Sequence, residues 1–267
     1  MGNNSFYYGQ NYLSRGGYLL MYNPYSLEGK TILITGASSG IGRATAIECS
    51  KLGAQCVIAA RNKERLQETF LQLEGRGHSQ ITAELTVEDD LNELVQNSPD
   101  LDGFVCCAGI SQTKPIGFTK KTDLESLFAV NTFAPFLLTK ELIKRKKIKK
   151  EGSVVLISSL ASKKEVCGNS VYGMTKAALE SFARYCALEN AQKKIRVNSI
   201  HPGMVLTEMI DNSVFSNETL EKEKESYPLK RFAKPQEIAW SIIYLLSDAS
   251  SWVTGTQLII DGGVHLV

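Results

Sequence analysis

From residue 30 onward, apolar residues follow two alternating spacings that predict strands and helices in turn. Short runs rich in β-branched residues predict strands, whereas apolar positions three and four residues apart predict helices. The predicted strands are residues 31–35, 56–60, 81–85, 101–107, 154–158, 196–200 and 257–260. The predicted helices include residues 41–52, a charged segment between the second and third strands, and residues 172–190. Another helix begins with a capping box formed by Thr122 and Glu125 and runs past Asn131, and the last begins at Pro235.

This alternation predicts an α/β fold. Parallel strands need crossover connections, and right-handed crossovers place helices on both faces of the sheet. A length of 267 residues suits one large domain, so we predict a single Rossmann-type, doubly wound parallel sheet of about seven strands with helices on both faces. Ligands in such folds bind beyond the carboxyl ends of the strands. The chemistry is therefore expected just after positions 35, 60, 107, 158 and 200.

The first 27 residues differ from the rest of the chain. They hold six of the ten tyrosines, carry almost no charge and show neither a strand nor a helix period. We predict a flexible leader over residues 1–27 and the folded, cofactor-binding domain over residues 28–267. Translation from Met21 and a partner-binding arm are the alternatives for the leader.

Composition and charge exclude several classes of protein. The formal net charge is only +2, from 30 basic and 28 acidic residues, so a nucleic-acid partner is not expected. The six cysteines lack the paired spacing of metal sites, which predicts reduced thiols, no metal and a cytoplasmic protein. No apolar run approaches the ~20 residues of a membrane span, and no secretory signal opens the chain.

A glycine-rich turn, residues 35–42, joins the first predicted strand to the first predicted helix. Gly36, Gly40 and Gly42 allow a tight turn and a close approach of the backbone to a pyrophosphate. The helix that follows supplies N–H donors and a partial positive charge. The turn therefore predicts a dinucleotide site, with an ordinary strand-to-helix turn as the alternative.

The second predicted strand ends in Arg61, where a binder of NAD would carry an aspartate or glutamate. A guanidinium pairs with the 2′-phosphate of NADP, whereas an acid would repel that phosphate. Arg61 therefore favours NADP(H) as the cofactor. A solvated surface arginine is the alternative interpretation.

A tyrosine and a lysine, Tyr172 and Lys176, lie one helical turn apart on the same face. An ammonium group beside a phenol favours its ionised form, which makes proton exchange with an alcohol or ketone oxygen feasible near neutral pH. Ser159 follows the fifth predicted strand and can donate to the same oxygen. Tyr-x-x-x-Lys alone occurs by chance in many chains, so the combination carries the prediction.

These motifs together resemble the short-chain dehydrogenase/reductase family, and the resemblance covers residues 28–266. The matching pieces are Thr35–Gly42, Cys107-Ala108-Gly109, Asn131, Ser158-Ser159, Tyr172 with Lys176, Pro202–Thr207 and Asp261-Gly262-Gly263. An ordered set of this kind is specific, so the resemblance implies the family's fold and its hydride-transfer chemistry.

The resemblance implies a catalytic tetrad. Tyr172 is expected to be the general acid/base and Ser159 to orient the carbonyl. Lys176 is expected to bind the nicotinamide ribose and to act on the tyrosine, and Asn131 to hold a water for proton relay. Ser159 is chosen over Ser158 because it precedes the tyrosine by thirteen residues, the family's usual spacing.

The resemblance also implies a set of cofactor contacts. They are Gly36, Ser38, Ser39, Gly40, Ile41, Gly42, Arg61, Glu84, Leu85, Ala108, Gly109, Tyr172, Lys176, Pro202, Gly203, Val205 and Thr207. The chain departs from the family twice. Cys106 and Cys107 replace two asparagines, and Glu84 stands where aspartate is more usual.

The substrate is less sharply indicated than the reaction. Residues 231–238 and 254–263 look most like bacterial 3-oxoacyl-[acyl-carrier-protein] reductases, a likeness shared by many sugar, steroid and small-alcohol dehydrogenases. The expected partner is therefore a small-molecule or acyl-carrier-bound carbonyl substrate, selected by residues 111–115, 163–169 and 204–229. A catalytically silent NADP-binding sensor or subunit is the alternative from another class. Family resemblance also implies a homotetramer of D₂ symmetry, paired through helices around Asn131 and Leu179 and the last strand.

Two lysine-rich places remain open to two interpretations. The run 144–150 holds six basic residues in seven. It is either a solvated helix end or, together with Lys193, a rim at the active-site mouth that receives an acidic carrier protein. Lys163 and Lys164 are either solvated or face an acidic substrate.

Overall fold

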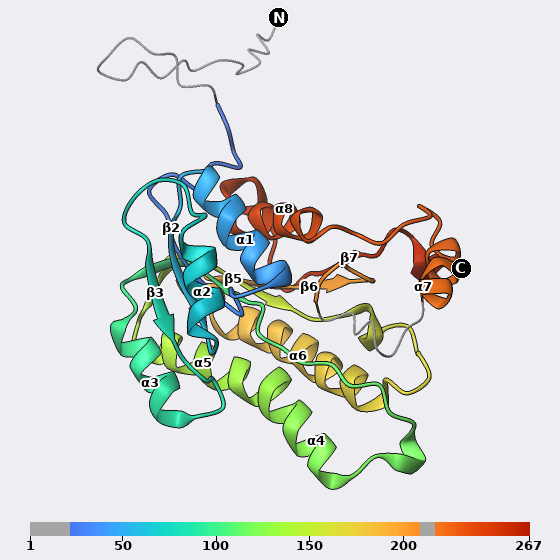
Figure 1. Ribbon diagram of the computed structural model, residues 1–267. Coiled ribbons are helices and arrows are strands. Elements are labelled where there is room, and N and C mark those ends of the chain that lie inside the picture. The colour runs from blue at the N-terminus through green and yellow to red at the C-terminus, as the bar shows by residue number, and fades with distance from the viewer. Residues whose placement is uncertain (1–21, 209–216) are drawn as a thin grey trace, which may run out of the picture.

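A computed structural model describes residues 22–208 and 217–267 of the chain. Seven parallel strands form one sheet in the order β3-β2-β1-β4-β5-β6-β7 (Figure 1). The strands are β1 Thr31–Thr35, β2 Gln55–Ala60, β3 Ser79–Thr82, β4 Leu101–Cys106, β5 Ile148–Ile157, β6 Arg196–Pro202 and β7 Gln257–Ile260. The predicted doubly wound parallel sheet of seven strands is confirmed.

Helices cover both faces of this sheet (Figure 1). They are α1 Gly40–Lys51, α2 Lys63–Phe70, α3 Glu88–Asn97, α4 Lys121–Phe128, α5 Ala134–Lys144, α6 Ser170–Glu189, α7 Asn217–Ser226 and α8 Pro235–Leu246. Side chains of α1, α2 and α8 pack into one apolar cluster, and those of α3, α5 and α6 into another. The central strand β1 contributes to both, because Ile32 and Ile34 face the first cluster and Leu33 the second.

The order of the strands reverses between β1 and β4. The register pairs Thr35 with Ala59 on one side and with Cys106 on the other, so the carboxyl ends of three strands lie level with one another. A crevice opens where such a sheet reverses its order, and ligands bind there. The residues that follow Thr35, Ala60 and Cys106 therefore border one crevice.

Two predicted elements differ from the structure, and two helices, α3 and α7, were not predicted. The third strand ends at Thr82, so Leu85 lies in the loop after it. Helix α3 was not predicted, although Leu91, Leu94 and Val95 are its buried face. Its first turn is Glu88-Asp89-Asp90, acidic residues that complement the positive end of a helix.

The long helix through Asn131 begins and continues differently from the prediction. Its first residue is Lys121, and the carboxylate of Asp123 accepts from the Lys120 N–H at 2.7 Å. Glu125 therefore does not form the capping box. Residues Ala129–Phe133 form a single π-helical stretch between α4 and α5. Such stretches insert an extra residue into a helix and are frequent at functional sites.

The boundary at residue 28 stays a prediction, and most of the leader, residues 1–21, lies outside the described residues. Packing against the sheet begins before residue 28, because Leu27 is fully buried and its N–H donates to Leu52 O at 3.0 Å. Tyr25 lies against Tyr244 of α8, with 6.4 Å between ring centroids. Residues 24–27 therefore pack onto the folded domain, whereas Tyr22 is exposed.

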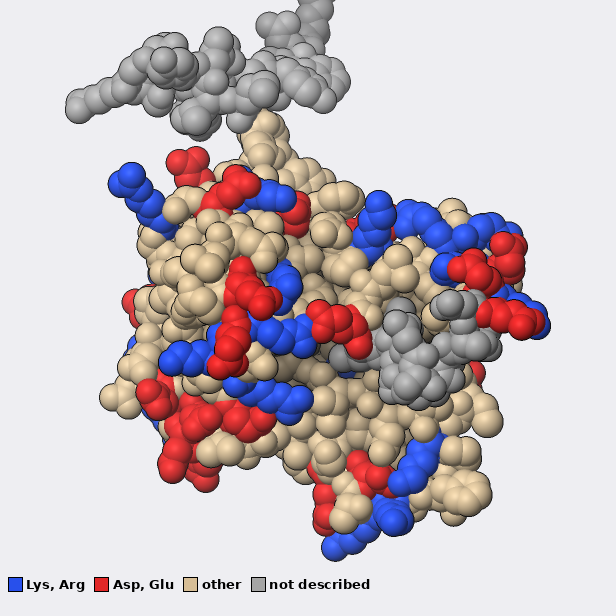
Figure 2. Space-filling model, viewed as in Figure 1, with Lys and Arg blue, Asp and Glu red and all other residues tan. Residues whose placement is uncertain are grey.

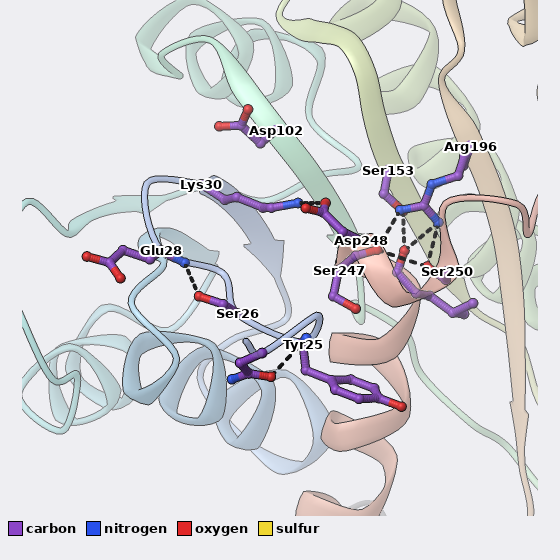
Figure 3. A network of polar contacts seen from close by, with 12 residues as sticks. Tyr25, Ser26, Glu28, Lys30, Asp102, Ser153, Arg196, Ser247, Asp248 and Ser250 are labelled. Atoms are coloured by element: carbon purple, nitrogen blue, oxygen red, sulfur yellow. Dashed lines mark hydrogen bonds and ion pairs between the residues drawn. The ribbon is translucent and has the colours of Figure 1, made fainter. Parts of the chain in front are cut away.

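A polar network fixes the end of α8 to the amino ends of the strands (Figure 3). The half-buried Arg196 guanidinium donates to Leu245 O and Ser250 Oγ, each at 2.8 Å. The Ser153 hydroxyl donates to the same Leu245 carbonyl at 2.6 Å, and Lys30 pairs with Asp248 at 2.5 Å. A cation at the last carbonyls of a helix satisfies groups that have no partner within the helix. The network stabilises the edge of the sheet opposite the crevice.

The predicted rim of residues 144–150 with Lys193 is wrong. The run lies at the amino end of β5, whereas Ser159 follows its carboxyl end. Ile148 pairs with Leu101 and Leu156 with Cys106, five residues farther along β4, so about 17 Å of strand at ~3.3 Å per residue separates the two ends. Lys193 follows α6 and precedes β6, so it also lies at the amino edge. Members of the run bind locally, as in the pair of Lys149 with Asp102 at 2.8 Å. The helix-end interpretation is the one that the topology supports.

Candidate active site

The glycine-rich turn lies in direct contact with the loop after β4. Gly36 has φ +68°, and a Cβ built on it would lie 2.7 Å from Ala108 N. A Cβ on Gly42 would lie 2.3 Å from Gly36 O. Both distances are too short for a real carbon atom. Glycine is therefore required at both positions if the turn and the loop are to meet.

A cavity of about 220 Å³ lies beside this turn. The predicted cofactor contacts that line it are Gly36, Ser38, Ser39, Gly40, Ile41, Gly42, Arg61, Glu84, Leu85, Ala108, Gly109 and Thr207. Backbone N–H groups at the amino end of α1 and an arginine at the mouth match the anionic groups of a dinucleotide. The residues present therefore fit a nicotinamide dinucleotide.

The side chain of Arg43 anchors the glycine-rich turn, a role that the sequence did not suggest. Its guanidinium donates to Ser38 O at 2.6 Å and to Thr69 Oγ1 at 3.0 Å, and it pairs with Glu68 at 3.2 Å. The arginine thus ties the turn to α2. The only signal was the position of Arg43 directly after Gly42.

Arg61 and Glu84 lie at the mouth of the cavity and face one another. Their charged groups are 3.5 Å apart, and the Arg61 side chain is 67% exposed, so its guanidinium is accessible to a ligand. The other carboxylate oxygen of Glu84 accepts from Thr86 Oγ1 at 3.0 Å. Charged side chains of both signs surround the hollow on this face of the molecule (Figure 2). Glutamate, which is longer than the aspartate more usual at position 84, thus reaches the guanidinium of Arg61.

Asn131 lies in the π-helical stretch and is fully buried. Its Oδ1 accepts from Ile110 N and its Nδ2 donates to Ile110 O, both at 2.9 Å. Nδ2 also donates to Thr175 Oγ1 at 3.2 Å. The side chain therefore braces the loop after β4 against α6. The expected role of Asn131 in holding a water stays a prediction.

Tyr172 and Lys176 lie on the face of α6 that points to the loop after β4. The Lys176 ammonium is 5.7 Å from the centre of the Tyr172 ring and donates to Ile157 O at 2.9 Å. Lys176 is buried and Tyr172 half-buried. Among the described residues, no group bonds to the tyrosine hydroxyl, which leaves it available to a substrate.

The two serines after β5 have different partners. Ser158 is buried, and its hydroxyl donates to Lys176 O at 3.0 Å. Ser159 is half-buried, and its oxygen accepts from Ala161 N at 3.1 Å, so its own proton is free to be donated. This difference agrees with the choice of Ser159 over Ser158.

Two further glycines bring the tetrad together. A Cβ on Gly109 would lie 3.2 Å from Asn131 Oδ1 and 3.3 Å from Lys176 Nζ. A Cβ on Gly173 would lie 2.7 Å from Ala161 O, in the turn that carries Ser159. The close approach of α6 to both loops therefore depends on residues without side chains. Gly173 was not singled out in the sequence.

The segment after β6 reaches the glycine-rich turn through Thr207. The methyl group of Thr207 lies 3.1 Å from where a Cβ on Gly40 would be. Val205 is buried and pairs with Ala233, and Gly203 N donates to Ile260 O at 3.0 Å. Five predicted cofactor contacts do not line the cavity and stay predictions: Tyr172, Lys176, Pro202, Gly203 and Val205. Within the predicted substrate segment 204–229, residues 209–216 lie outside the described residues.

The ammonium groups of Lys163 and Lys164 both have partners within the protein, although Lys163 is exposed, as the solvated interpretation expects. Lys163 bonds to Glu180 Oε1 at 2.9 Å and to Gln257 Oε1 at 2.6 Å. Lys164 donates to Val264 O at 2.5 Å. Both ammonium groups therefore fasten the loop after β5 to neighbouring elements.

The cysteine pair that departs from the family lies at the end of β4. Burial raises the pKa of the Cys106 thiol, which suppresses its thiolate. Cys107 lines the cavity beside Ala108. Within residues 22–208 and 217–267, no three His, Cys, Asp or Glu side chains group as a metal site would need. No helix in these ranges is long and apolar enough to cross a membrane.

Comparisons with known proteins agree with this geometry. A family model described as enoyl-(acyl carrier protein) reductase matches residues 36–265. An L-xylulose reductase of Caenorhabditis elegans is 33% identical over 244 residues, 90% of this chain and 97% of that protein. The 3-oxoacyl-[acyl-carrier-protein] reductase FabG of Rickettsia prowazekii (strain Madrid E) is 31% identical over 241 residues, 90% of this chain and 99% of that protein.

Solved structures show the same similarity. A dehydrogenase/reductase from Sinorhizobium meliloti 1021 superposes with a TM-score of 0.83 at 30% sequence identity, over 90% of this chain and 97% of that one. The match of the family model extends over most of the chain, from the glycine-rich turn to beyond β7. The chain belongs to the short-chain dehydrogenase/reductase family of oxidoreductases.

Proposed function

We propose that the protein is an NADP(H)-dependent oxidoreductase that interconverts a carbonyl and an alcohol with Tyr172 as the proton donor and acceptor. The observation that carries the proposal is the convergence of Lys176 and Asn131 on Gly109, at the end of the cavity that suits a dinucleotide. Ser159 lies in the turn after β5 and Tyr172 on α6, and these two elements touch where Gly173 meets Ala161 O. Fold alone does not define a function, so the proposal rests on this arrangement of groups.

The mechanism follows from the state of each side chain. Ser159 accepts from Ala161 N, which leaves its proton free to be donated to the substrate oxygen. Tyr172 gives its proton to that oxygen as negative charge grows on it, and Lys176 favours the phenolate that remains. The nicotinamide supplies the hydride when bound. In the direction of oxidation, the same groups take the proton back.

Turnover tests this proposal directly. A panel of 3-oxoacyl thioesters, sugars, steroids and small ketones is incubated with NADPH, and the loss of its absorbance is followed. We expect at least one carbonyl to be reduced at a rate far above that of the Tyr172→Phe variant. An absence of turnover on the whole panel, with NADPH bound, would instead favour the silent sensor or subunit.

Substrate choice rests on two loops that are fastened to each other. Lys114 N donates to Gly168 O at 2.8 Å, and Thr113 Oγ1 bonds to Asn169 Oδ1 at 3.2 Å. The loop after β4 and the loop after β5 therefore form one border of the substrate site. A 3-oxoacyl thioester is the first substrate to test, because of the likeness to the Rickettsia reductase. A sugar is the second, because of the equal likeness to the L-xylulose reductase.

Cofactor choice gives a separate prediction. We expect NADPH to have a lower Michaelis constant than NADH, because the exposed Arg61 guanidinium can pair with the 2′-phosphate. Arg61→Asp should reverse this preference, by about tenfold or more in each Michaelis constant. Lys63→Asp is the matched control, since it makes the same change of charge two residues away at an exposed position. Equal affinity of the wild type for both cofactors would refute the role of Arg61.

Assembly into a homotetramer is also proposed. Leu179 is buried against the sheet and so cannot pair subunits, but other apolar side chains on α5 and α6 are exposed: Phe133, Phe136, Leu137, Tyr185 and Leu188. We expect light scattering at micromolar concentration to give the mass of four chains, and Leu188→Glu to reduce it. Leu71→Glu is the control, because Leu71 is equally exposed at 75% but follows α2. A monomeric wild type would contradict the prediction.

A further inference from the structure

A chain of buried hydrogen bonds lies directly behind the Ser159 turn. Ser199 Oγ is 2.9 Å from His201 Nε2, and His201 Nδ1 is 3.1 Å from Ser162 Oγ. The Ser162 hydroxyl donates to the Ser159 carbonyl at 2.8 Å. His201 is fully buried at the carboxyl end of β6. The chain thus connects β6 to the backbone of the residue whose hydroxyl faces the substrate.

The imidazole in this chain is neutral at neutral pH. Burial lowers the pKa of His201 to about 4, against the opposing effect of the Glu180 carboxylate. A neutral imidazole carries a single N–H, so one ring nitrogen donates and the other accepts. The direction of the whole chain is therefore set by which nitrogen holds the proton.

One of the two directions satisfies more groups than the other. If Nδ1 holds the proton, Ser199 donates to Nε2, Nδ1–H donates to Ser162, and Ser162 donates to the Ser159 carbonyl, which uses all three short contacts. If Nε2 holds the proton, the Ser162 hydroxyl must donate to Nδ1, and the Ser159 carbonyl keeps only its bond from the Ser162 backbone N–H at 3.1 Å. Ser199 must then turn to Thr256 O at 3.4 Å, a weaker bond.

The neighbouring ion pairs hold Ser162 in place without competing strongly for its proton. Glu180 Oε2 is 3.3 Å from Ser162 Oγ, longer than the bond to the Ser159 carbonyl. The other Glu180 oxygen bonds to Lys163 at 2.9 Å and to Arg184 at 2.6 Å. Both cations bind Oε1, so Ser162 Oγ is the only described partner of Oε2. The shorter distance favours the Ser159 carbonyl over Oε2 as the acceptor of the Ser162 proton.

We infer that His201 is a positioning residue for Ser159: as the Nδ1–H tautomer it orients Ser162, which fixes the Ser159 carbonyl and hence the direction of the Ser159 hydroxyl. The inference rests on the proposed function, in which that hydroxyl holds the substrate oxygen. The Ser159 residue is then held on both sides, through its carbonyl by Ser162 and through its side chain by Ala161 N. Such a turn loses little orientational freedom when the substrate binds.

Two substitutions of the histidine separate its two nitrogens. An asparagine amide reaches about the position of Nδ1, and a glutamine amide about that of Nε2. His201→Asn should therefore keep the donor to Ser162 and retain kcat within about twofold. His201→Gln should lose that donor and lower kcat on the order of tenfold. Neither variant should change the Michaelis constant for NADPH, because the hydrogen-bond chain through His201 does not reach the cofactor cavity.

Ser162→Ala removes the last bond of the chain and should lower kcat to the same extent as His201→Gln. Ser98→Ala is the matched control, since Ser98 is also buried and donates to a backbone carbonyl, Leu94 O, at 2.7 Å. Both serine variants should lose stability, but only Ser162→Ala should lose turnover. Equal values of kcat for the two serine variants, or equal losses for the two histidine variants, would overturn the inference.

The tautomer of His201 is measured without any substrate. The chain has three histidines, so ¹⁵N-labelled histidine gives few resonances, and the His201→Asn variant assigns the one that matters. The coupling pattern of an Nδ1–H ring is expected. An Nε2–H ring would overturn the inference whether or not a ketone is reduced. A wild type that reduces no ketone would refute the proposed function alone. The measured tautomer of His201 would still show whether the hydrogen-bond chain runs in the inferred direction.

Discussion

Tyr172→Phe should lower turnover by at least two orders of magnitude while leaving the affinity for NADPH nearly unchanged. A positioned acid or base contributes about 10²–10⁴-fold to such reactions, and the variant removes only the hydroxyl that exchanges the proton. The ring is retained, and the tyrosine hydroxyl bonds to no other described residue, so its loss should not disturb the fold. Steady-state kinetics with NADPH titration measures both quantities.

Lys176→Ala is the comparison that separates the two roles on α6. The lysine is buried and bonds to Ile157 O, so its removal should weaken cofactor binding as well as turnover. A Tyr172→Phe variant that kept more than about a tenth of wild-type turnover would have lost under ~1.4 kcal/mol of transition-state stabilisation. Tyr172 would then not be the acid/base.

The sequence was most informative where one side chain type or a period dictates structure. The apolar runs located the inner strands most closely, because a parallel strand buried on both faces needs apolar residues throughout. The exposed edge strand β3 was predicted two to three residues too late. The glycine-rich turn was placed correctly because few residues other than glycine can adopt the φ of Gly36. Tyr172 and Lys176 were recognised because their spacing brings them to one face of a helix.

Long-range geometry was what the sequence could not supply. The basic run 144–150 precedes Ser159 by few residues, but an extended strand separates the two, so nearness in sequence did not mean nearness in space. The π-helical stretch at Asn131 has no helical period of its own to reveal it. Arg43 contacts side chains of α2, and Gly173 lies against a carbonyl in the turn after β5, and those contacts exist only after the sheet has formed.

The hydrogen-bond chain through His201 could not be predicted from the sequence for the same reason. Ser199 and His201 lie on β6 and Ser162 in the turn after β5, and each alone is an ordinary polar residue. Their roles depend on burial, which removes water as a competing partner and leaves each hydroxyl only a few acceptors. A pattern of residues cannot express the direction of the chain. It becomes definite only when the distances to Ser159 and Glu180 are known.

Gly42→Ala should reduce the affinity for NADPH by about 100-fold or more, equivalent to ~2.7 kcal/mol. Alanine is the better helix former by about 1 kcal/mol, so propensity alone would make the variant more stable. The added Cβ, however, would lie 2.3 Å from Gly36 O and 3.1 Å from Ala37 N, both backbone atoms. The turn must move, and its N–H groups then no longer converge on the pyrophosphate.

The sign of the stability change tests this account of Gly42. Forcing a methyl group into a packed site costs about 1–3 kcal/mol, which outweighs the gain in propensity, so the free energy of unfolding should fall. Gly117→Ala is the control, because a Cβ there meets no atom within 4 Å. Fluorescence titration with NADPH and urea denaturation measure the two effects. A Gly42→Ala variant that bound NADPH within threefold of the wild type would show that the turn does not hold the cofactor through its backbone.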